Sequence, residues 1–327
     1  MIYFITNNKK QGTTAVYKRL PGKMLIIAIL LLATACNPEP TTAPELPEEP
    51  ITELQLEVEQ VQEAAEHFEY EIIDELEYEL EEDEVEMHAE AEIEDDYFEI
   101  YSIEGTADSM TGGRWERMLA WRNEAALFAE QYRDTVIVNM NPADNVVFLT
   151  FDDGPDPVNT VKVINTLIEY DVSATFFFTG ENIRRHGEVV RQAHEAGFSL
   201  GLHGYSHISM RDLTADEIIA ELDETNDLLE AITGARSKIM RPPYGAVGHD
   251  EIEIIRGQNL QIYLWSLDTL DWAQDNAYEI LRNIKEHIRP GDIILMHAFS
   301  GQHRVPEILP SIIEFIRDEG YEMRALT

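Results

Sequence analysis

From about residue 136 onward, short apolar runs alternate with longer segments in which apolar residues recur at helical spacing. The apolar runs have the length and the β-branched or aromatic content of buried strands, and they cover residues 146–149, 174–178, 198–202, 238–240, 261–265 and 292–296, with a last strand expected near 321–326. The helical patterns cover residues 157–170, 182–196, 214–234, 250–256, 278–288 and 306–318. This alternation predicts an α/β fold with a parallel sheet, and about seven repeats favour a (β/α) barrel over an open sheet.

Polar, titratable side chains directly follow five of the predicted strands. They are Asp152 and Asp153, His203 and His207, Arg241, Asp268 and Asp271, and His297. Active sites of parallel α/β proteins are built at the carboxyl edge of the sheet, where the strand ends meet. Asp-Asp-Gly-Pro is also a good turn sequence, so a plain turn is the alternative for the first pair. The repetition at five strand ends predicts one shared site.

The first 35 residues have the pattern of a secretion signal. Lysines and an arginine precede an apolar run of about twelve residues at 24–35, too short to span a bilayer comfortably but suited to a signal-peptide core. Cys36, the only cysteine, follows at once, and residues 32–36 resemble a bacterial lipoprotein lipobox with Ala33 where Leu is more usual. We therefore expect residues 1–35 to be a lipoprotein signal, Cys36 to carry the lipid, and the mature protein to be extracytoplasmic and anchored in the bacterial cell membrane. An ordinary cleaved signal and a secreted product are the alternative.

Residues 36–112 contain proline and are then strongly acidic. About 28 Asp and Glu but no Lys or Arg lie between Lys23 and Arg114, so roughly 23 of the 39 net negative charges fall in residues 1–113. Like charges at this density repel one another, which predicts a disordered or partly helical spacer. Binding of cations or of a basic partner is the alternative for this segment. The acidic balance argues against nucleic acid as a partner.

A transition segment at 113–143 is predicted to hold an amphipathic helix at 113–133 and a leading strand, ahead of a single domain at 144–327. That domain is long enough for one sizeable core. The apolar side chains expected to anchor the helix on it are Trp115, Leu119, Trp121, Leu127 and Phe128.

His203 and His207 are spaced so that one helical turn would put both imidazoles on the same side. With Asp153 they make a three-ligand set, and three protein ligands leave a catalytic zinc site one open position. Zinc is the expected ion. Cobalt and manganese are the alternatives, because two histidines and a carboxylate suit several first-row metals. A surface helix that carries His-x-x-x-His by chance is the competing interpretation.

Proton-transfer candidates surround this set. Asp152 would stay free as a general base, and His297 would act as general acid with Asp271 as its partner. Arg241 could hold a site carboxylate, and residues 242–245 form a stiff turn whose backbone N–H could face an oxyanion. For His297 the alternative is a buried structural histidine, and for Arg241 it is a structural salt bridge. Trp272 would line a small apolar pocket or simply pack.

Five motifs in order resemble the polysaccharide deacetylases, the NodB-homology group or carbohydrate esterase family four, over about residues 144–327. The motifs are TFDDGP at 150–155, HGYSH at 203–207, RPPYG at 241–245, DTLDW at 268–272 and Leu295-Met296-His297. The family fold is a distorted (β/α) barrel. Two positions depart from the family pattern: Gly204 stands where Thr or Ser is common, and Ala298 where Asp often follows the last histidine.

The resemblance implies a role for each matching residue. Those roles are Asp152 as base; Asp153, His203 and His207 as metal ligands; His297 as acid, tuned by Asp271; Arg241 as the group orienting the aspartates; the Tyr244 N–H as oxyanion donor; and Trp272 with Leu295 as the site of the acetyl methyl. Neither departure removes one of these groups, so we expect activity.

The expected function is metal-dependent removal of N-acetyl groups from the sugars of a cell-wall or extracellular polysaccharide, peptidoglycan or chitin-like, with release of acetate. An O-acetyl esterase acting on a xylan-type polymer and a non-catalytic glycan-binding lipoprotein are the alternatives. The expected partners are the acetylated polysaccharide and, through the lipid, the membrane. We expect a monomer.

Overall fold

The computed structural model describes residues 98–299 and 304–327. The predicted signal segment, Cys36 and the spacer up to residue 97 lie outside the described residues. Among the residues described, no helix combines the length and the apolar character needed to cross a membrane.

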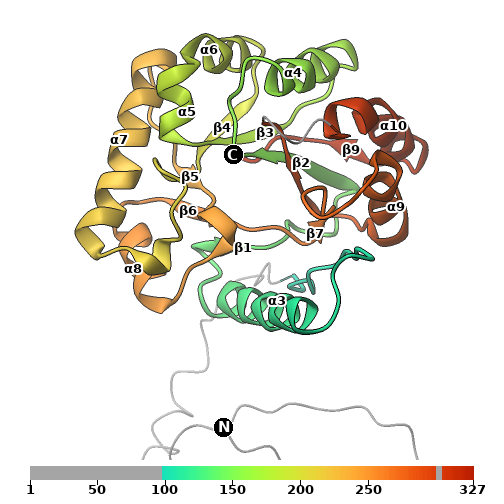
Figure 1. The fold of residues 1–327 in the computed structure, drawn as a ribbon, viewed down its shortest axis with the longest axis horizontal. Helices are drawn as coiled ribbons and strands as arrows, with labels where there is room; N and C mark the ends of the chain where they lie inside the picture. The colour runs from blue at the N-terminus through green and yellow to red at the C-terminus, as the bar shows by residue number, and fades with distance from the viewer. Residues whose placement is uncertain (1–97, 300–303) are drawn as a thin grey trace, which may run out of the picture. The chain divides into compact units, whose positions relative to one another are not determined.

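A curled parallel sheet organises the domain, and the predicted barrel is confirmed (Figure 1). Its nine strands run in the order β1-β6-β5-β4-β3-β2-β8-β7, and β9 pairs with β2. The strands are β1 (Val136–Ile137), β2 (Val146–Asp152), β3 (Thr175–Phe178), β4 (Ser199–Leu202), β5 (Ile239–Met240), β6 (Gln261–Tyr263), β7 (Leu267–Asp268), β8 (Ile293–His297) and β9 (Glu322–Met323). The apolar run at 261–265 thus ends early as a strand, and β7 follows it after a short break.

Helices surround the sheet in Figure 1 and cover its outer side. They are α3 (Gly113–Gln131), α4 (Asn159–Glu169), α5 (Gly180–Arg185), α6 (Gly187–Glu195), α7 (Ala215–Thr233), α8 (His249–Gly257), α9 (Ala277–His287) and α10 (Arg304–Asp318). Six of the seven predicted helices, including the one at 113–133, are confirmed within a few residues. The remaining one, expected at 182–196, is instead two helices, because the chain leaves helical geometry at His186 (φ −136°, ψ 43°) next to Gly187, a poor helix former.

The central strand β2 is buried along all seven residues, as expected for a strand with β3 on one side and β8 on the other. Its apolar side chains join a phenylalanine cluster, in which the rings of Phe151 and Phe176 stack at 5.3 Å between centroids. Parallel pairing places Asp152 opposite His297. The register of β2 and β8 therefore brings together two residues that are far apart in sequence.

α7 shows how local sequence sets an element. Thr214 and Glu217 have the three-residue spacing by which a sequence indicates a capping box, and they form one; Gly234 ends the helix in the left-handed conformation at φ 82°. Its buried face, which includes Leu222 and Leu229, packs on the domain core. This helix is confirmed to within a residue at each end.

β1 and β7 are the two ends of the strand order. The segment before β1 packs against both of these strands. In Figure 1, α3 runs beneath β1 and β7. Glu104 forms a parallel bridge with Leu267, and Ile103 is buried in the core. Residues 98–112, predicted as part of the spacer, are thus packed on the domain, and the predicted boundary at residue 112 is too late.

α3 contacts the domain through only part of its predicted apolar face. Phe128 is buried, and Trp115 and Trp121 are partly buried against apolar clusters. Leu119 and Leu127 were expected to be anchors as well, but they are 41% and 63% exposed. The prediction was wrong for these two because the helix rests on the domain along a narrower stripe than the sequence pattern indicates.

Candidate active site

The carboxyl end of β2 supplies two acidic side chains with different surroundings. Asp152 is the last strand residue and is almost fully buried. Asp153 follows at φ 71°, a left-handed conformation that an L-residue other than glycine adopts rarely. The Asn182 side chain donates a hydrogen bond of 2.7 Å to the Asp153 carbonyl.

Asp153, His203 and His207 bring three donor atoms to within 4.8 Å of one another, as predicted for the metal site. Asp153 Oδ1 lies 3.2 Å from Nε2 of His203 and 3.0 Å from Nε2 of His207. This oxygen is buried and makes no hydrogen bond of good geometry among the described residues. A buried carboxylate oxygen without an aligned donor, next to two imidazole nitrogens, fits a cation in the shared space.

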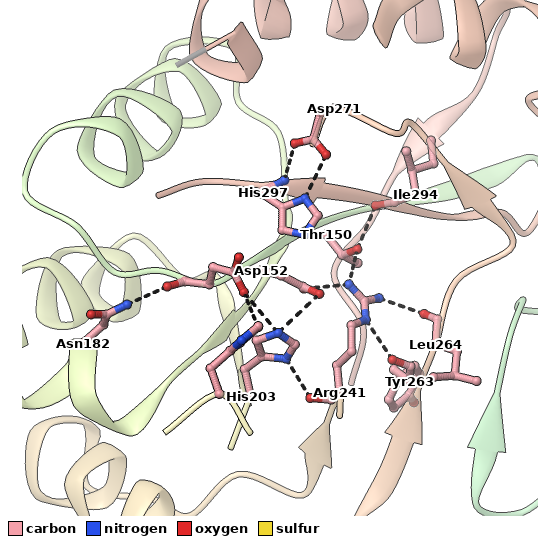
Figure 2. Close-up of polar contacts among 12 residues, drawn as sticks. Thr150, Asp152, Asn182, His203, Arg241, Tyr263, Leu264, Asp271, Ile294 and His297 are labelled. Atoms are coloured by element: carbon pink, nitrogen blue, oxygen red, sulfur yellow. Dashed lines mark hydrogen bonds and ion pairs between the residues drawn. The ribbon is translucent and has the colours of Figure 1, made fainter. Parts of the chain in front are cut away.

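The tautomer of His203 also fits a metal ligand. Its Nδ1 lies 2.7 Å from the Arg241 carbonyl, which can only accept, so Nδ1 carries a hydrogen (Figure 2). Nε2 is the ring nitrogen that lies next to Asp153 and could bind a metal. A hydrogen bond of this kind fixes the ring orientation of metal-binding histidines. The donor set is therefore oriented as well as assembled.

Burial and charge act in opposite directions on this set. Burial favours the protonated form of Asp153, but contacts with His203 and His207 outweigh it and hold the pKa of Asp153 well below its usual range. Burial likewise disfavours the charged imidazolium of His203, yet the nearby charges of Asp152 and Asp153 raise its pKa. Negative charge at the site thus attracts positive charge, whether a proton or a metal ion.

The two histidines do not lie on a helical turn, so the reason given for their proximity was wrong. Residues 203–207 form a loop after β4, in which Gly204 (φ 68°) and His207 (φ 59°) have left-handed backbone. At Gly204 the conformation is one that serine or threonine adopts rarely. The loop geometry, and not the period of a helix, turns both rings toward Asp153.

Glu221 on α7 holds this loop, although the sequence pattern did not indicate it. Its carboxylate accepts hydrogen bonds from the backbone N–H groups of Tyr205 at 2.6 Å and Ser206 at 2.8 Å, and from the Ser206 hydroxyl at 2.5 Å. A hydroxyl at 204 is therefore not needed to brace the histidine loop. In the sequence, Glu221 is one of many acidic residues on an amphipathic helix, so only tertiary structure distinguishes it.

Arg241 is fully buried and makes four hydrogen bonds of 2.8 Å, shown in Figure 2. Its guanidinium donates to Asp152 Oδ1, to the Thr150 hydroxyl, and to the backbone carbonyls of Tyr263 and Leu264. Burial lowers the pKa of Arg241, and the neighbouring Asp152 opposes that effect. The predicted contact with an aspartate is present, and Thr150, which the sequence pattern did not single out, belongs to the same network.

His297 ends β8, and two of its donor groups contact Asp271. Its backbone N–H and its Nδ1 each lie 2.8 Å from a carboxylate oxygen of Asp271 (Figure 2). Burial alone would lower the pKa of His297, but Asp271, with smaller contributions from Asp153 and Asp152, raises it to about 10. The imidazole is therefore protonated at neutral pH, with Nε2 left to donate.

Tyr244 lies in a short 3₁₀ turn, Pro243–Gly245, with a left-handed backbone at φ 62°. No backbone hydrogen bond found among the described residues uses its N–H. Its ring is 65% exposed and meets His207 edge-on at 4.7 Å between centroids. Among the described residues the predicted oxyanion donor is thus unpaired, and the ring of the same residue contacts a metal-ligand candidate.

The remaining predicted residues lie on the loop after β7 and on β8. Asp268 is buried, its pKa is raised to about 6 by burial, and it accepts the Leu270 N–H, so it organises the loop that carries Asp271. Trp272 is 41% exposed on the same loop, and Leu295 is buried. Ala298, the second departure from the family pattern, is buried and donates its N–H to the Asp152 carbonyl.

Known proteins are similar to slightly more than half of this chain. Residues 139–263 match the family model described as polysaccharide deacetylase. A peptidoglycan-N-acetylglucosamine deacetylase of Bacillus cereus is 35% identical over 176 residues, which cover 53% of this chain and 64% of that relative. A second one of the same species is 31% identical, with 55% and 68% covered. The chain therefore aligns with less than two thirds of the first relative's length.

A solved structure has the same fold. The crystal structure of the Bc1960 peptidoglycan N-acetylglucosamine deacetylase, in complex with an N-oxidanyl-benzamide, matches with a TM-score of 0.56 at 32% identity. The match covers 58% of this chain and 89% of that one.

Proposed function

Because the chain belongs to the polysaccharide deacetylase family, we propose that it is a metal-dependent hydrolase that removes N-acetyl groups from a cell-wall polysaccharide and releases acetate. One observation carries the proposal: Asp153, His203 and His207 converge beside Asp152, whose carboxylate is held by the buried Arg241. A glycan-binding protein would need neither group in this arrangement.

Asp153, His203 and His207 are the residues that would hold the metal. Two imidazoles and one carboxylate suit zinc, with cobalt and manganese as the other ions of choice. Bound there, a divalent ion would supply Lewis-acid polarisation and lower the pKa of water enough for attack at neutral pH.

The residues around the ligands divide the proton transfers. Asp152 takes a proton from the attacking water, whose oxygen forms a bond to the acetamide carbon. The Tyr244 N–H donates to the carbonyl oxygen as negative charge develops on it. His297, held by Asp271, gives a proton to the nitrogen as the carbon–nitrogen bond breaks. Acetate and a free amino sugar result.

Trp272 and Leu295 are proposed to receive the acetyl methyl. Leu295 is buried on β8, two residues before His297, and Trp272 follows Asp271. Both therefore belong to the two segments that supply the proposed acid and its partner. An apolar contact there would favour acetyl over larger acyl groups.

Peptidoglycan is the polymer that we propose as substrate. The named relatives and the solved structure are all peptidoglycan N-acetylglucosamine deacetylases, which supports this choice. A lipid on Cys36, together with the acidic spacer, would keep the domain outside the cell and within reach of the wall. The single cysteine at the end of an apolar run supports the anchor.

The test is an assay of acetate release from peptidoglycan, chitin oligomers and acetylated xylan. We expect release from an N-acetylated polymer, loss of release with a chelator, and recovery on adding zinc, cobalt or manganese. Asp152→Asn should lower kcat by about 10³-fold, because it removes the base. Asp144→Asn, an exposed change just before the other end of β2, should leave kcat unchanged.

Other outcomes would contradict the proposal. Release from acetylated xylan alone would indicate an O-acetyl esterase. No release from any polymer, with no divalent ion bound by the purified protein, would favour a glycan-binding lipoprotein. An Asp152→Asn protein as fast as wild type would exclude Asp152 as the base.

A further inference from the structure

α3 lies outside the residues that match the family model, 139–263, yet it contacts the turn that carries Tyr244. The indole N–H of Trp121 donates a hydrogen bond of 3.1 Å to the carbonyl of Gly245, the residue directly after Tyr244. The turn is thus bound to α3 through its own backbone.

The fit between Trp121 and Gly245 is close. A Cβ built on Gly245 would lie 2.4 Å from the Trp121 ring and 3.0 Å from the Trp265 ring, so only glycine leaves room for the two indoles. These rings also contact each other, with 4.9 Å between centroids, and Trp265 lies 5.5 Å from the Arg241 guanidinium. Trp121 therefore packs against the turn and against Trp265, whose ring lies next to the Arg241 guanidinium.

A second contact joins α3 to the same loop. Glu124, three residues after Trp121, pairs with Arg211 at 2.7 Å, and Arg211 donates its Nε–H to the Val247 carbonyl at 2.8 Å. The two contacts hold the loop at Gly245 and at Val247. Trp121 contacts the loop directly and Glu124 acts through Arg211, and both side chains come from one turn of the helix.

The turn has little of its own to hold it. Tyr244 and Gly245 both have left-handed backbone, at φ 62° and φ 63°, and two backbone hydrogen bonds close the turn, from Gly245 to Pro242 and from Ala246 to Pro243. A strained conformation persists only where its surroundings determine it. The Tyr244 ring is mostly exposed, so the contacts that hold the turn are those made at the neighbouring Gly245.

We propose that α3 supports the catalytic centre and that Trp121 is a positioning residue. Trp121 holds the Pro243–Gly245 turn so that the Tyr244 N–H faces the oxygen on which negative charge develops. The proposal rests on the proposed deacetylase function. It gives α3, which lies outside the residues that match the family model, a part in the reaction. Trp121 acts through the turn and touches no reacting atom.

Two variants of Trp121 test the proposal by kinetics. Trp121→Phe keeps an aromatic ring but loses the N–H, and Trp121→Ala loses both. Because small misplacements of catalytic groups are costly, we expect kcat to fall about 5-fold in the first and about 20-fold in the second, with KM within about twofold of wild type. Leu127→Ala, an exposed change on the same helix, is the matched control and should behave as wild type.

Hydrogen exchange gives a second measurement that needs no substrate. Protection of the Gly245 and Ala246 amides should fall about tenfold in Trp121→Ala and stay unchanged in Leu127→Ala, while protection in β2 and β8 is retained in both. A wild-type protein that releases no acetate would end the proposed function. The exchange result would still decide whether α3 holds the turn.

Three results would overturn the proposal. The first is wild-type kcat in both folded Trp121 variants. The second is a fall in kcat accompanied by an equal loss of bound metal or of protection throughout the sheet, which would show a general structural role. The third is unchanged exchange at Gly245 and Ala246.

Discussion

Paired contacts with Asp271 set the charge state of His297. Two hydrogen bonds of 2.8 Å join His297 to the carboxylate, and the pKa of His297 rises to about 10 although burial opposes the charge. The sign of the effect on stability follows from linkage. The contribution of the His297–Asp271 pair to the free energy of unfolding is complete below the ordinary imidazole pKa of 6.5, and it is lost as the pH rises through about 10.

Asp271→Asn should move the basic limb of the pH profile of kcat/KM to lower pH. A general acid acts only while it is protonated, and without the carboxylate, burial lowers the pKa of His297. We expect a shift of at least about one pH unit, measured by acetate release between pH 5 and 11. Asp275→Asn, a nearby change on the same loop, is the control. A basic limb at the same pH in Asp271→Asn would contradict the role of Asp271.

At the scale of elements, a loop and a helix cooperate to place the metal ligands. β4 ends at Leu202, and the loop that follows carries both histidines, but α7 holds that loop through Glu221. The outer partners of metal ligands set affinity by fixing their orientation. Glu221 is thus expected to affect metal binding without touching the metal.

Glu221→Gln should weaken zinc binding by about tenfold. The amide has one acceptor oxygen in place of two, and its NH₂ would face the donor groups of the loop. Affinity is measured by competition with a chromophoric chelator, and bound metal by elemental analysis. Glu224→Gln, an exposed change on the same helix, should keep wild-type affinity. Equal affinity in both variants would exclude a role for Glu221.

At the scale of the whole molecule, the metal site connects strands that are distant in sequence. Asp153 follows β2, and the two histidines follow β4, so an ion shared by them would join separate parts of the sheet. An ion that binds only the folded state stabilises it by about 2.7 kcal/mol at a concentration 100 times its Kd. Metal binding should therefore be visible in thermal unfolding.

Removal of metal by a chelator should lower the Tm of the wild-type protein by several degrees, and added zinc should restore it. His207→Ala removes one ligand, so its Tm should be lower and less sensitive to the chelator. Differential scanning calorimetry measures both proteins with and without chelator. A wild-type Tm that is the same in both conditions would contradict a structural contribution of the metal.

The local pattern determined the elements and the residue types of the site. Alternating apolar runs predicted the parallel strands, Thr214 and Glu217 predicted the start of α7, and polar residues after the strands predicted where a site would form. These features depend on side chains within a few residues of one another, so they can be inferred without the fold. The motif at 150–155 and its four companions then identified the family.

Tertiary structure alone decided how these parts meet. The left-handed loop at 203–207, the hold of Glu221 on it, the contact of Trp121 with Gly245 and the packing of residues 98–112 all join segments that are distant in sequence. The exposure of Leu119 and Leu127 was also set by which stripe of α3 meets the domain. Apolar periodicity indicates that a face is buried, but the partner and the exact contacts depend on how the whole chain packs.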